Sequence, residues 1–216
     1  MEKKLVIFDL DGTLLNTLDD LTDSTNFVLS EFGYPKRTIG EVQRFVGNGV
    51  AKLIERAVPG GCKNLNYEKC IDLFKENYKI NMRNKTVPYS GIIEMLEKLK
   101  SFGIKTAVVS NKFDDAVRDL CNKYFNNLID FSAGENESAG IKKKPAPDSV
   151  IKVLEYFKIE QSDAIYVGDS EVDIQTANNS GLDCISVLWG FKDKEFLQNY
   201  GAKILISKPD ENFKYL

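Results

Sequence analysis

The 216-residue sequence contains no histidine. This absence excludes nucleophilic catalysis by Ser–His–Asp or Cys–His groups, and it excludes metal sites that use imidazole ligands. If the protein transfers protons near neutral pH, carboxylates or lysines must carry them. Any catalytic centre in this chain is therefore expected to depend on aspartate, glutamate and lysine.

Cysteine is scarce as well. The four cysteines, Cys62, Cys70, Cys121 and Cys184, form no CxxC pair, so their spacing predicts neither a zinc site nor a thioredoxin-like redox site. The apolar run LVIF near the N-terminus is too short for the hydrophobic region of a signal peptide. No stretch approaches the length of a membrane span. We therefore expect a cytoplasmic protein with reduced thiols and no membrane partner.

The sequence also lacks an excess of positive charge. Lysine and arginine number 29 against 32 aspartates and glutamates, the net charge is −3, and the two signs are interspersed. This balance predicts no nucleic-acid partner. Hydrophobic residues make up 43% of the chain, as is typical of a globular protein. The length fits one large domain, or a main domain with an insert.

Hydrophobic periodicity predicts a helical insert within an α/β domain. Apolar runs predict strands over residues 4–10, 104–109, 128–132, 164–167, 184–188 and 203–206. Spacings of three and four predict helices over 18–32, 38–46, 50–58, 67–82, 92–102, 114–124, 148–157 and 173–179. Alternating strands and helices indicate a parallel, Rossmann-like sheet. We expect residues 1–15 and 86–216 to form this core and residues 16–85 to form a small helical domain inserted after the first strand.

Polar residues gather where the predicted strands end. Asp9, Asp11, Gly12 and Thr13 lie at the end of the first strand, Ser110 and Asn111 at the end of the second, and Asp169 at the end of a later one. Lys144 lies in a loop before a predicted helix. In open parallel sheets, ligands bind beyond the carboxyl ends of the strands, so these groups can converge.

Asp9 and Asp11 form a pair of carboxylates at the end of a buried strand. One carboxylate can bind a metal ion while the other holds a proton and serves as acid and base. Alternatively, Asp11 and Gly12 form an ordinary turn. That reading does not account for Asp9, because an unpaired carboxylate is costly to bury after an apolar run. Single residues elsewhere also have plain structural readings: Asp169 as a helix cap, Ser110 as a loop residue and Lys144 as a solvated lysine.

Four segments together resemble the motifs of the haloacid dehalogenase-like hydrolase superfamily. They are DLDGTLLNT at 9–17, VVSNK at 108–112, KKPAPD at 143–148 and VGDSEVDIQTA at 167–177. They occur in the family's order, and the resemblance covers nearly the whole chain, including a helical cap after the first motif. The resemblance implies a Mg²⁺-dependent enzyme that forms an aspartyl-phosphate.

The resemblance also implies a role for each matching position. Asp9 is similar to the nucleophile and Asp11 to the general acid/base. Magnesium would be held by Asp9, Asp169 and the main-chain carbonyl of Asp11, with Asp173 and Thr13 supporting these ligands. The remaining matches, Ser110, Asn111 and Lys144, are similar to substrate-binding positions that contact the phosphoryl group.

Residues 45–57 resemble the cap of phosphoglycolate phosphatase-like members of the superfamily. Gly47 and Gly49 match a glycine pair there, which allows close backbone approach to a small anion. Alternatively, the two glycines only join two helices. Arg44 and Lys52 have the same two readings, as contacts for a substrate carboxylate or as solvated helix residues.

The expected function is hydrolysis of small phosphomonoesters, with 2-phosphoglycolate as the leading candidate substrate. Alternatives are a sugar-phosphate mutase of the same superfamily and a pyrophosphatase or nucleotidase. The absence of histidine disfavours the mutase, because the mutases resemble one another in a cap histidine. A non-catalytic module of the same fold is a further alternative, disfavoured because every expected catalytic position is present. The protein is expected to be a monomer or a homodimer.

Overall fold

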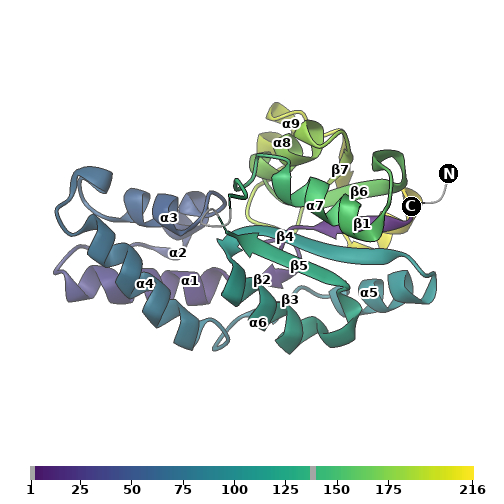
Figure 1. Cartoon of the computed structure of the whole chain (residues 1–216). Helices are drawn as coiled ribbons and strands as arrows, with labels where there is room; N and C mark the ends of the chain where they lie inside the picture. The colour runs from purple at the N-terminus through teal and green to yellow at the C-terminus, as the bar shows by residue number, and fades with distance from the viewer. Residues whose placement is uncertain (1–2, 137–139) are drawn as a thin grey trace. The chain divides into compact units, whose positions relative to one another are not determined.

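A computed structural model describes residues 3–136 and 140–216. The chain divides into two compact units (Figure 1). The core unit comprises Met1–Leu15 and Pro88–Leu216, and the helical unit comprises Asn16–Val87. In the described part of the chain, no helix combines the length and the apolar character needed to cross a membrane.

The core unit is built on a six-stranded parallel sheet. Its strands lie in the order β5-β4-β1-β6-β7-β8, and every neighbouring pair is parallel. The strands are β1 Leu5–Phe8, β4 Lys105–Phe113, β5 Phe131–Glu135, β6 Ala164–Gly168, β7 Asp183–Val187 and β8 Ile204–Ile206. The predicted α/β, Rossmann-like fold class is confirmed.

Helices cover both faces of this sheet, α7 and α8 on one face and α5 and α6 on the other (Figure 1). The helices of the core unit are α5 Ile92–Ser101, α6 Asp114–Phe125, α7 Asp148–Phe157, α8 Glu171–Asn179 and α9 Lys194–Asn199. Short 3₁₀ turns occupy Asn126–Leu128, Gln161–Asp163 and Pro209–Lys214. Because both faces are covered, the central strands are apolar on both sides, which explains the continuous run LVIF.

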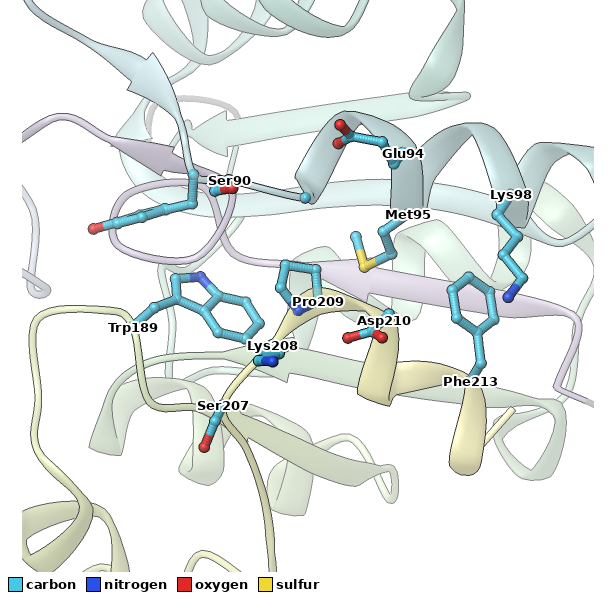
Figure 2. Close-up of a pocket in the computed structure, with 12 residues that line it drawn as sticks. Ser90, Glu94, Met95, Lys98, Trp189, Ser207, Lys208, Pro209, Asp210 and Phe213 are labelled. Atoms are coloured by element: carbon cyan, nitrogen blue, oxygen red, sulfur yellow. The ribbon is translucent and has the colours of Figure 1, made fainter.

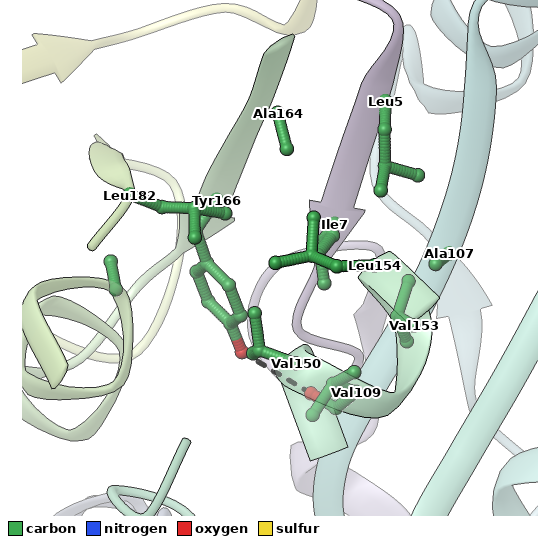
Figure 3. Packing of buried hydrophobic residues seen from close by; sticks show 11 residues of the cluster. Leu5, Ile7, Ala107, Val109, Val150, Val153, Leu154, Ala164, Tyr166 and Leu182 are labelled. Atoms are coloured by element: carbon green, nitrogen blue, oxygen red, sulfur yellow. Dashed lines mark hydrogen bonds between the residues drawn. The ribbon is translucent and has the colours of Figure 1, made fainter. Parts of the chain in front are cut away.

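Side-chain alternation divides the strand residues between the two faces. Leu5 and Ile7 of β1 pack in a buried cluster with residues of β4, β6, α7 and α8 (Figure 3). Val6 and Phe8, which alternate with them, are equally buried. Tyr166 is the polar member of the cluster, and its hydroxyl lies 3.3 Å from the main-chain oxygen of Val109.

Three local predictions differ from the structure. The strand predicted over 128–132 begins at Phe131, because the Thr106 hydroxyl binds the Leu128 carbonyl and residues 126–128 form a 3₁₀ turn. Strand β4 runs on to Phe113 past a register shift, so Ser110 and Asn111 lie within the strand and not after it. Helix α9 was not predicted. Its six residues are too few for a clear periodicity, although Asp193 caps its first turn.

The helical unit contains four α-helices and one 3₁₀ turn. They are α1 Leu18–Glu31, α2 Ile39–Phe45, α3 Val50–Ala57, α4 Tyr67–Asn81 and the turn Gly61–Lys63. A capping box is present at the start of α2, where the Thr38 and Glu41 side chains bind each other's backbone N–H groups. The short strands β2 Leu15–Asn16 and β3 Val87–Pro88 form a separate two-stranded sheet at the two ends of the insert.

A buried carboxylate joins the two ends of the helical unit. Asp20 of α1 is 1% exposed, and it accepts hydrogen bonds from the backbone N–H groups of Lys85 and Thr86 and from the Thr86 hydroxyl. The distances from the Asp20 carboxylate oxygens to these three donors are 3.0 Å, 2.9 Å and 2.8 Å, respectively. Asp20 therefore fixes residues 85 and 86 against the first turn of α1.

Replacing Asp20 with alanine is expected to lower the free energy of unfolding by about 3 kcal/mol, because buried donors lose a charged acceptor. Urea unfolding of the purified variant measures this loss. Asp23→Ala is the matched control, since Asp23 lies on the same helix and pairs with Lys85 at the exposed surface, where ion pairs contribute little. Equal effects of the two substitutions would contradict the structural role of Asp20.

Candidate active site

The candidate site lies beyond the two central strands of the sheet. Asp9 directly follows β1, and Asp169 directly follows β6. The two strands are neighbours, and the chain order reverses between them, with β4 and β5 on one side and β6 to β8 on the other. A crevice outside the sheet forms at such a switch point. The Asp9 N–H donates to the Val167 carbonyl at 2.9 Å, which holds the two strand ends together.

Three buried carboxylates meet at this position. Asp9, Asp169 and Asp173 each bring one carboxylate oxygen to within 4.8 Å of the others, and all three residues are buried. Asp173 lies in the first turn of α8, and Asp9 and Asp169 come from the ends of different strands. The fold thus brings together acidic residues that are far apart in the chain: Asp9 and Asp173 are 164 positions apart.

Lys144 stabilises this acidic cluster. Its ammonium lies 2.8 Å from Asp9 Oδ1, 2.7 Å from Asp173 Oδ1 and 3.0 Å from the Tyr166 hydroxyl. Burial lowers the pKa of Lys144, but the negative charges of Asp173 and Asp9 raise it by more than burial lowers it. The pKa of Lys144 therefore lies well above its usual value. Lys144 is therefore a permanent cation, and the reading of this residue as a solvated lysine is wrong, because it is 5% exposed.

Burial also controls the carboxylates. It raises the pKa of Asp9 from 3.8 to about 7, an effect that Lys144 opposes and that Asp173 and Asp11 reinforce. Burial and the negative charges of Asp173 and Asp9 raise the pKa of Asp169 well above its usual range. The three acids therefore repel one another in a poorly solvated space, as expected where a cation belongs.

The donor set fits a hard divalent cation. In the described residues, Asp9 Oδ2 accepts no hydrogen bond, whereas Oδ1 is bound by Lys144. Both oxygens of Asp173 are already bound, Oδ1 by Lys144 and Oδ2 by the N–H and hydroxyl of Ser170. Carboxylate oxygen is the ligand type that Mg²⁺ prefers. Among the described residues, Asp173 accepts four hydrogen bonds, against two for Asp169 and one for Asp9, so Asp9 and Asp169 keep more lone pairs for a metal ion than Asp173 does.

Asp11 has a partner that sequence reasoning missed. The Lys112 ammonium lies 2.8 and 3.0 Å from the two oxygens of Asp11, and the side chains are only 4% and 13% exposed. Lys112 belongs to the VVSNK segment, so the signal was a lysine directly after the expected phosphate-binding residues. Tyr166 was missed as well. Its signal was a tyrosine in the buried strand AIYVG, where a phenol needs a polar partner.

The polar residues of β4 support Lys144 and Lys112. The Asn111 side chain receives the Lys144 N–H at 2.8 Å and donates to the Lys144 carbonyl at 3.0 Å. The Ser110 hydroxyl accepts the Lys112 N–H at 3.2 Å. Asn111 was expected among the substrate-binding groups, but these contacts give it a part in holding the backbone of Lys144.

The loop after β1 packs closely against Asp169. Thr13 Oγ1 lies 3.4 Å from Asp169 Oδ1, as expected for a supporting residue, and the Phe191 N–H donates to Asp169 Oδ2 at 2.7 Å. Gly12 has a φ of +86°, and a Cβ there would collide with the Asp169 carboxylate. A Cβ at Gly190 would collide with Asp169 and with the Gly12 carbonyl. Glycine at these two positions lets both loops approach the acid.

The predicted substrate-binding glycines belong to the helical unit. Gly47 and Gly49 have φ values of +118° and +84°, which favour glycine. Arg56 holds their loop by donating to the Phe45 carbonyl at 2.6 Å and to Asn48 Oδ1 at 2.9 Å. Lys52 pairs with Glu55 at 2.7 Å within its own helix. A contact of Gly47, Gly49, Arg44 or Lys52 with substrate stays a prediction.

The chain is similar to several proteins named phosphoglycolate phosphatase. A curated relative from Psychrobacter arcticus, named phosphoglycolate phosphatase, is 33% identical over 220 residues that cover 99% of this chain and 92% of the relative. A phosphoglycolate phosphatase from Aquifex aeolicus is 33% identical, with coverage of 87% and 86%. A crystal structure of a candidate phosphoglycolate phosphatase from Lactobacillus delbrueckii subsp. bulgaricus is 33% identical, with a TM-score of 0.94 and coverage of 100% and 98%.

A family model also matches most of the chain. The model described as haloacid dehalogenase-like hydrolase matches residues 6–187, a range that contains Asp9, Asp11, Lys144, Asp169 and Asp173. The chain therefore belongs to the haloacid dehalogenase-like hydrolase family, in the branch of its curated relatives named phosphoglycolate phosphatase.

Proposed function

We propose that this enzyme is a Mg²⁺-dependent phosphatase that hydrolyses small phosphomonoesters through an aspartyl-phosphate on Asp9. The observation that carries the proposal is the state of the Asp9 carboxylate. One oxygen is held by the Lys144 ammonium at 2.8 Å, and the other accepts no hydrogen bond from the described residues. An oriented carboxylate with one oxygen available is what nucleophilic attack requires.

In the first half-reaction, Asp9 Oδ2 forms a bond to phosphorus while the bond from phosphorus to the leaving oxygen breaks. The Asp11 carboxyl group gives its proton to that leaving oxygen, which departs as an alcohol. The Ser110 hydroxyl donates to a phosphoryl oxygen, and the positive charge of Lys144 attracts the phosphoryl oxygens, where negative charge is spread in the transition state. Lys144 also orients the Asp9 carboxylate and opposes the rise in its pKa that burial causes.

In the second half-reaction, water replaces Asp9 on phosphorus. Asp11, now deprotonated, removes a proton from the attacking water, the bond from phosphorus to Asp9 Oδ2 breaks, and inorganic phosphate leaves. Asp9 returns as a carboxylate and Asp11 returns protonated, so the cycle closes. Lys112 orients the Asp11 carboxyl group for both proton transfers.

Asp9, Asp169 and the main-chain carbonyl of Asp11 are proposed to hold Mg²⁺, with Asp173 and Thr13 as supporting residues. When bound, the ion offsets the repulsion between the Asp9 carboxylate and the anionic phosphoryl group. Four carboxylates (Asp9, Asp11, Asp169 and Asp173) face two ammonium groups in this site, so the fully ionised cluster has a surplus of negative charge that a divalent cation matches.

The proposed substrate is 2-phosphoglycolate. The names of the relatives from Psychrobacter arcticus and Aquifex aeolicus support it, and so does the glycine pair Gly47 and Gly49 in the helical unit, which suits a small anion. The proposed role of the helical unit is that of a cap that excludes water.

A substrate screen tests this function. Purified protein with MgCl₂ is incubated with 2-phosphoglycolate, hexose 1-phosphates, nucleoside monophosphates and pyrophosphate, and released phosphate is measured. We expect the highest kcat/KM for 2-phosphoglycolate. Release from none of these compounds by folded protein would contradict a phosphatase, and conversion of a hexose 1-phosphate to its isomer would indicate a mutase.

Magnesium binding is expected to depend on pH. Because the pKa of Asp9 is about 7 in the metal-free site, Mg²⁺ must displace a proton at lower pH. MgCl₂ should therefore raise the unfolding temperature more at about pH 8 than at about pH 6. Without metal, the folded state holds the extra proton between about pH 4 and pH 7, so stability should fall as pH rises through that window.

Thermal unfolding with and without MgCl₂ measures both effects, and NaCl at equal ionic strength is the control for screening. The same MgCl₂ effect at both pH values would contradict binding through Asp9.

A further inference from the structure

A second cavity lies in the core unit, and it shares no residue with the acidic cluster. Its volume is about 650 Å³, which is within the usual range of small-molecule sites. Figure 2 shows the side chains that line it, from the start of α5, the loop after β7 and the C-terminal segment. The lining residues are Tyr89, Ser90, Gly91, Glu94, Met95, Lys98, Trp189, Ser207, Lys208, Pro209, Asp210 and Phe213.

The apolar part of this pocket is rich in rings. Trp189 and Pro209 lie towards one end, and Phe213 and Lys98 lie at the other (Figure 2). The Lys98 ammonium is 4.3 Å from the centre of the Phe213 ring. Met95 and Pro209 are buried. Flat rings, a thioether and a proline ring form the kind of surface on which an aromatic ligand packs.

Hydrogen bonds hold this surface in place. The Trp189 indole N–H donates to the Thr13 carbonyl at 3.0 Å, which fixes the orientation of the ring. The side-chain amide of Asn212 lies 3.2 Å from Met95 Sδ and 2.9 Å from the Pro209 carbonyl. A pocket whose walls are already held requires little ordering when a ligand binds.

The polar part of the pocket carries charges of both signs. Glu94, Lys98, Lys208 and Asp210 line it. In the described residues, the side chains of Glu94, Lys208 and Asp210 make no hydrogen bond and no ion pair, and Lys98 contacts only aromatic rings. A ligand with a single charge would be attracted by two of these groups and repelled by the other two, whereas a ligand with both charges finds partners for each.

We propose that this pocket binds a small aromatic zwitterion, of the chemical class of an aromatic amino acid. Its ring packs against Trp189, Met95 and Pro209, its anionic group faces the lysines, and its cationic group faces Glu94 and Asp210. The inference does not depend on the proposed function, because none of the catalytic residues takes part.

The chain offers a direct test, because Trp189 is its only tryptophan. Fluorescence excited where only indole absorbs therefore comes from a side chain that lines this pocket. L-phenylalanine is the probe. Hydrocinnamate, which lacks the ammonium group, and phenethylamine, which lacks the carboxylate, are its matched analogues.

We expect L-phenylalanine to change the Trp189 emission saturably, with a dissociation constant on the order of millimolar. Each analogue should bind about three- to fivefold more weakly, as expected for the loss of one exposed ion pair. Lys208→Ala should remove the advantage of L-phenylalanine over phenethylamine. Lys203→Ala, a nearby exposed lysine that does not line the pocket, should bind like the wild type.

Any of three outcomes would overturn the proposal. The first is the absence of a saturable emission change with all three compounds. The second is binding of the three compounds with equal affinity, and the third is binding that Lys208→Ala leaves unchanged. Phosphate release is not measured in this experiment, so each outcome leaves the proposed phosphatase untouched.

Discussion

Asp9→Asn is expected to abolish phosphate release, with a loss in kcat of more than about 10⁴-fold, while the protein stays folded. The substitution removes the carboxylate oxygen that attacks phosphorus, and an amide does not form the covalent intermediate. Burial already favours the uncharged form of Asp9, whose pKa is raised to about 7. A neutral isostere should therefore not destabilise the metal-free protein.

Steady-state phosphate release from 2-phosphoglycolate measures the loss, and thermal unfolding without MgCl₂ checks the fold. Asp183→Asn is the matched control, because Asp183 is an exposed aspartate at the start of β7, away from the acidic cluster. It should retain the wild-type rate. Loss of a covalent nucleophile lowers the rate by far more than tenfold. If Asp9→Asn released phosphate within tenfold of the control, the assignment of the nucleophile would therefore be wrong.

The second large effect is expected for Asp11→Asn, with a loss in kcat of about 10²–10⁴-fold. Asparagine cannot give a proton to the leaving oxygen or take one from water, although it keeps the shape of the side chain. A substrate with a good leaving group, such as 4-nitrophenyl phosphate, needs little protonation of that oxygen. Asp11→Asn should therefore slow the formation of the aspartyl-phosphate less with this substrate than with 2-phosphoglycolate. Burst kinetics measure that step separately.

Lys112→Met distinguishes a positioning role from a merely structural one. Lys112 binds both oxygens of Asp11 and is proposed to act only through it. We expect a smaller loss in kcat, about tenfold, and a double variant Asp11→Asn, Lys112→Met no slower than Asp11→Asn alone. Multiplicative losses in the double variant would show that Lys112 acts independently of Asp11.

The strands and helices of this protein follow closely from local sequence. The run LVIF predicts a strand that is buried on both faces, and β1 is such a strand. Thr38 and Glu41 predict the capping box of α2, which is present. Both signals depend on residues within a few positions of one another. Segments with a weaker local signal, such as α9 and the end of β4, were missed or misplaced because contacts with distant segments decide them.

Asp9 and Asp169 were also singled out from sequence, because each comes at the end of an apolar strand, and Asp173 was singled out from the family motif that residues 167–177 resemble. Their pairing was not. Nothing near Lys144 in the chain indicates that its ammonium binds Asp9, Asp173 and the Tyr166 hydroxyl. The hydrogen bonds between the Asn111 side chain and the backbone of Lys144 were not indicated by the sequence either, and the contact of Asn111 with substrate stays a prediction.

The sequence by itself determined the α/β fold class, and it predicted the position of the insert and the residues proposed to carry the chemistry, since periodicity and motifs are properties of short segments. Only the tertiary structure decided which ammonium group faces which carboxylate, and that Lys112 and Tyr166 belong to the site. The pocket beside Trp189 also arises only from folding, because it joins residues near 90 with residues near 210. Charge pairing and cavities depend on distances of a few ångströms between segments that the chain keeps far apart, and strand order and helix packing set those distances.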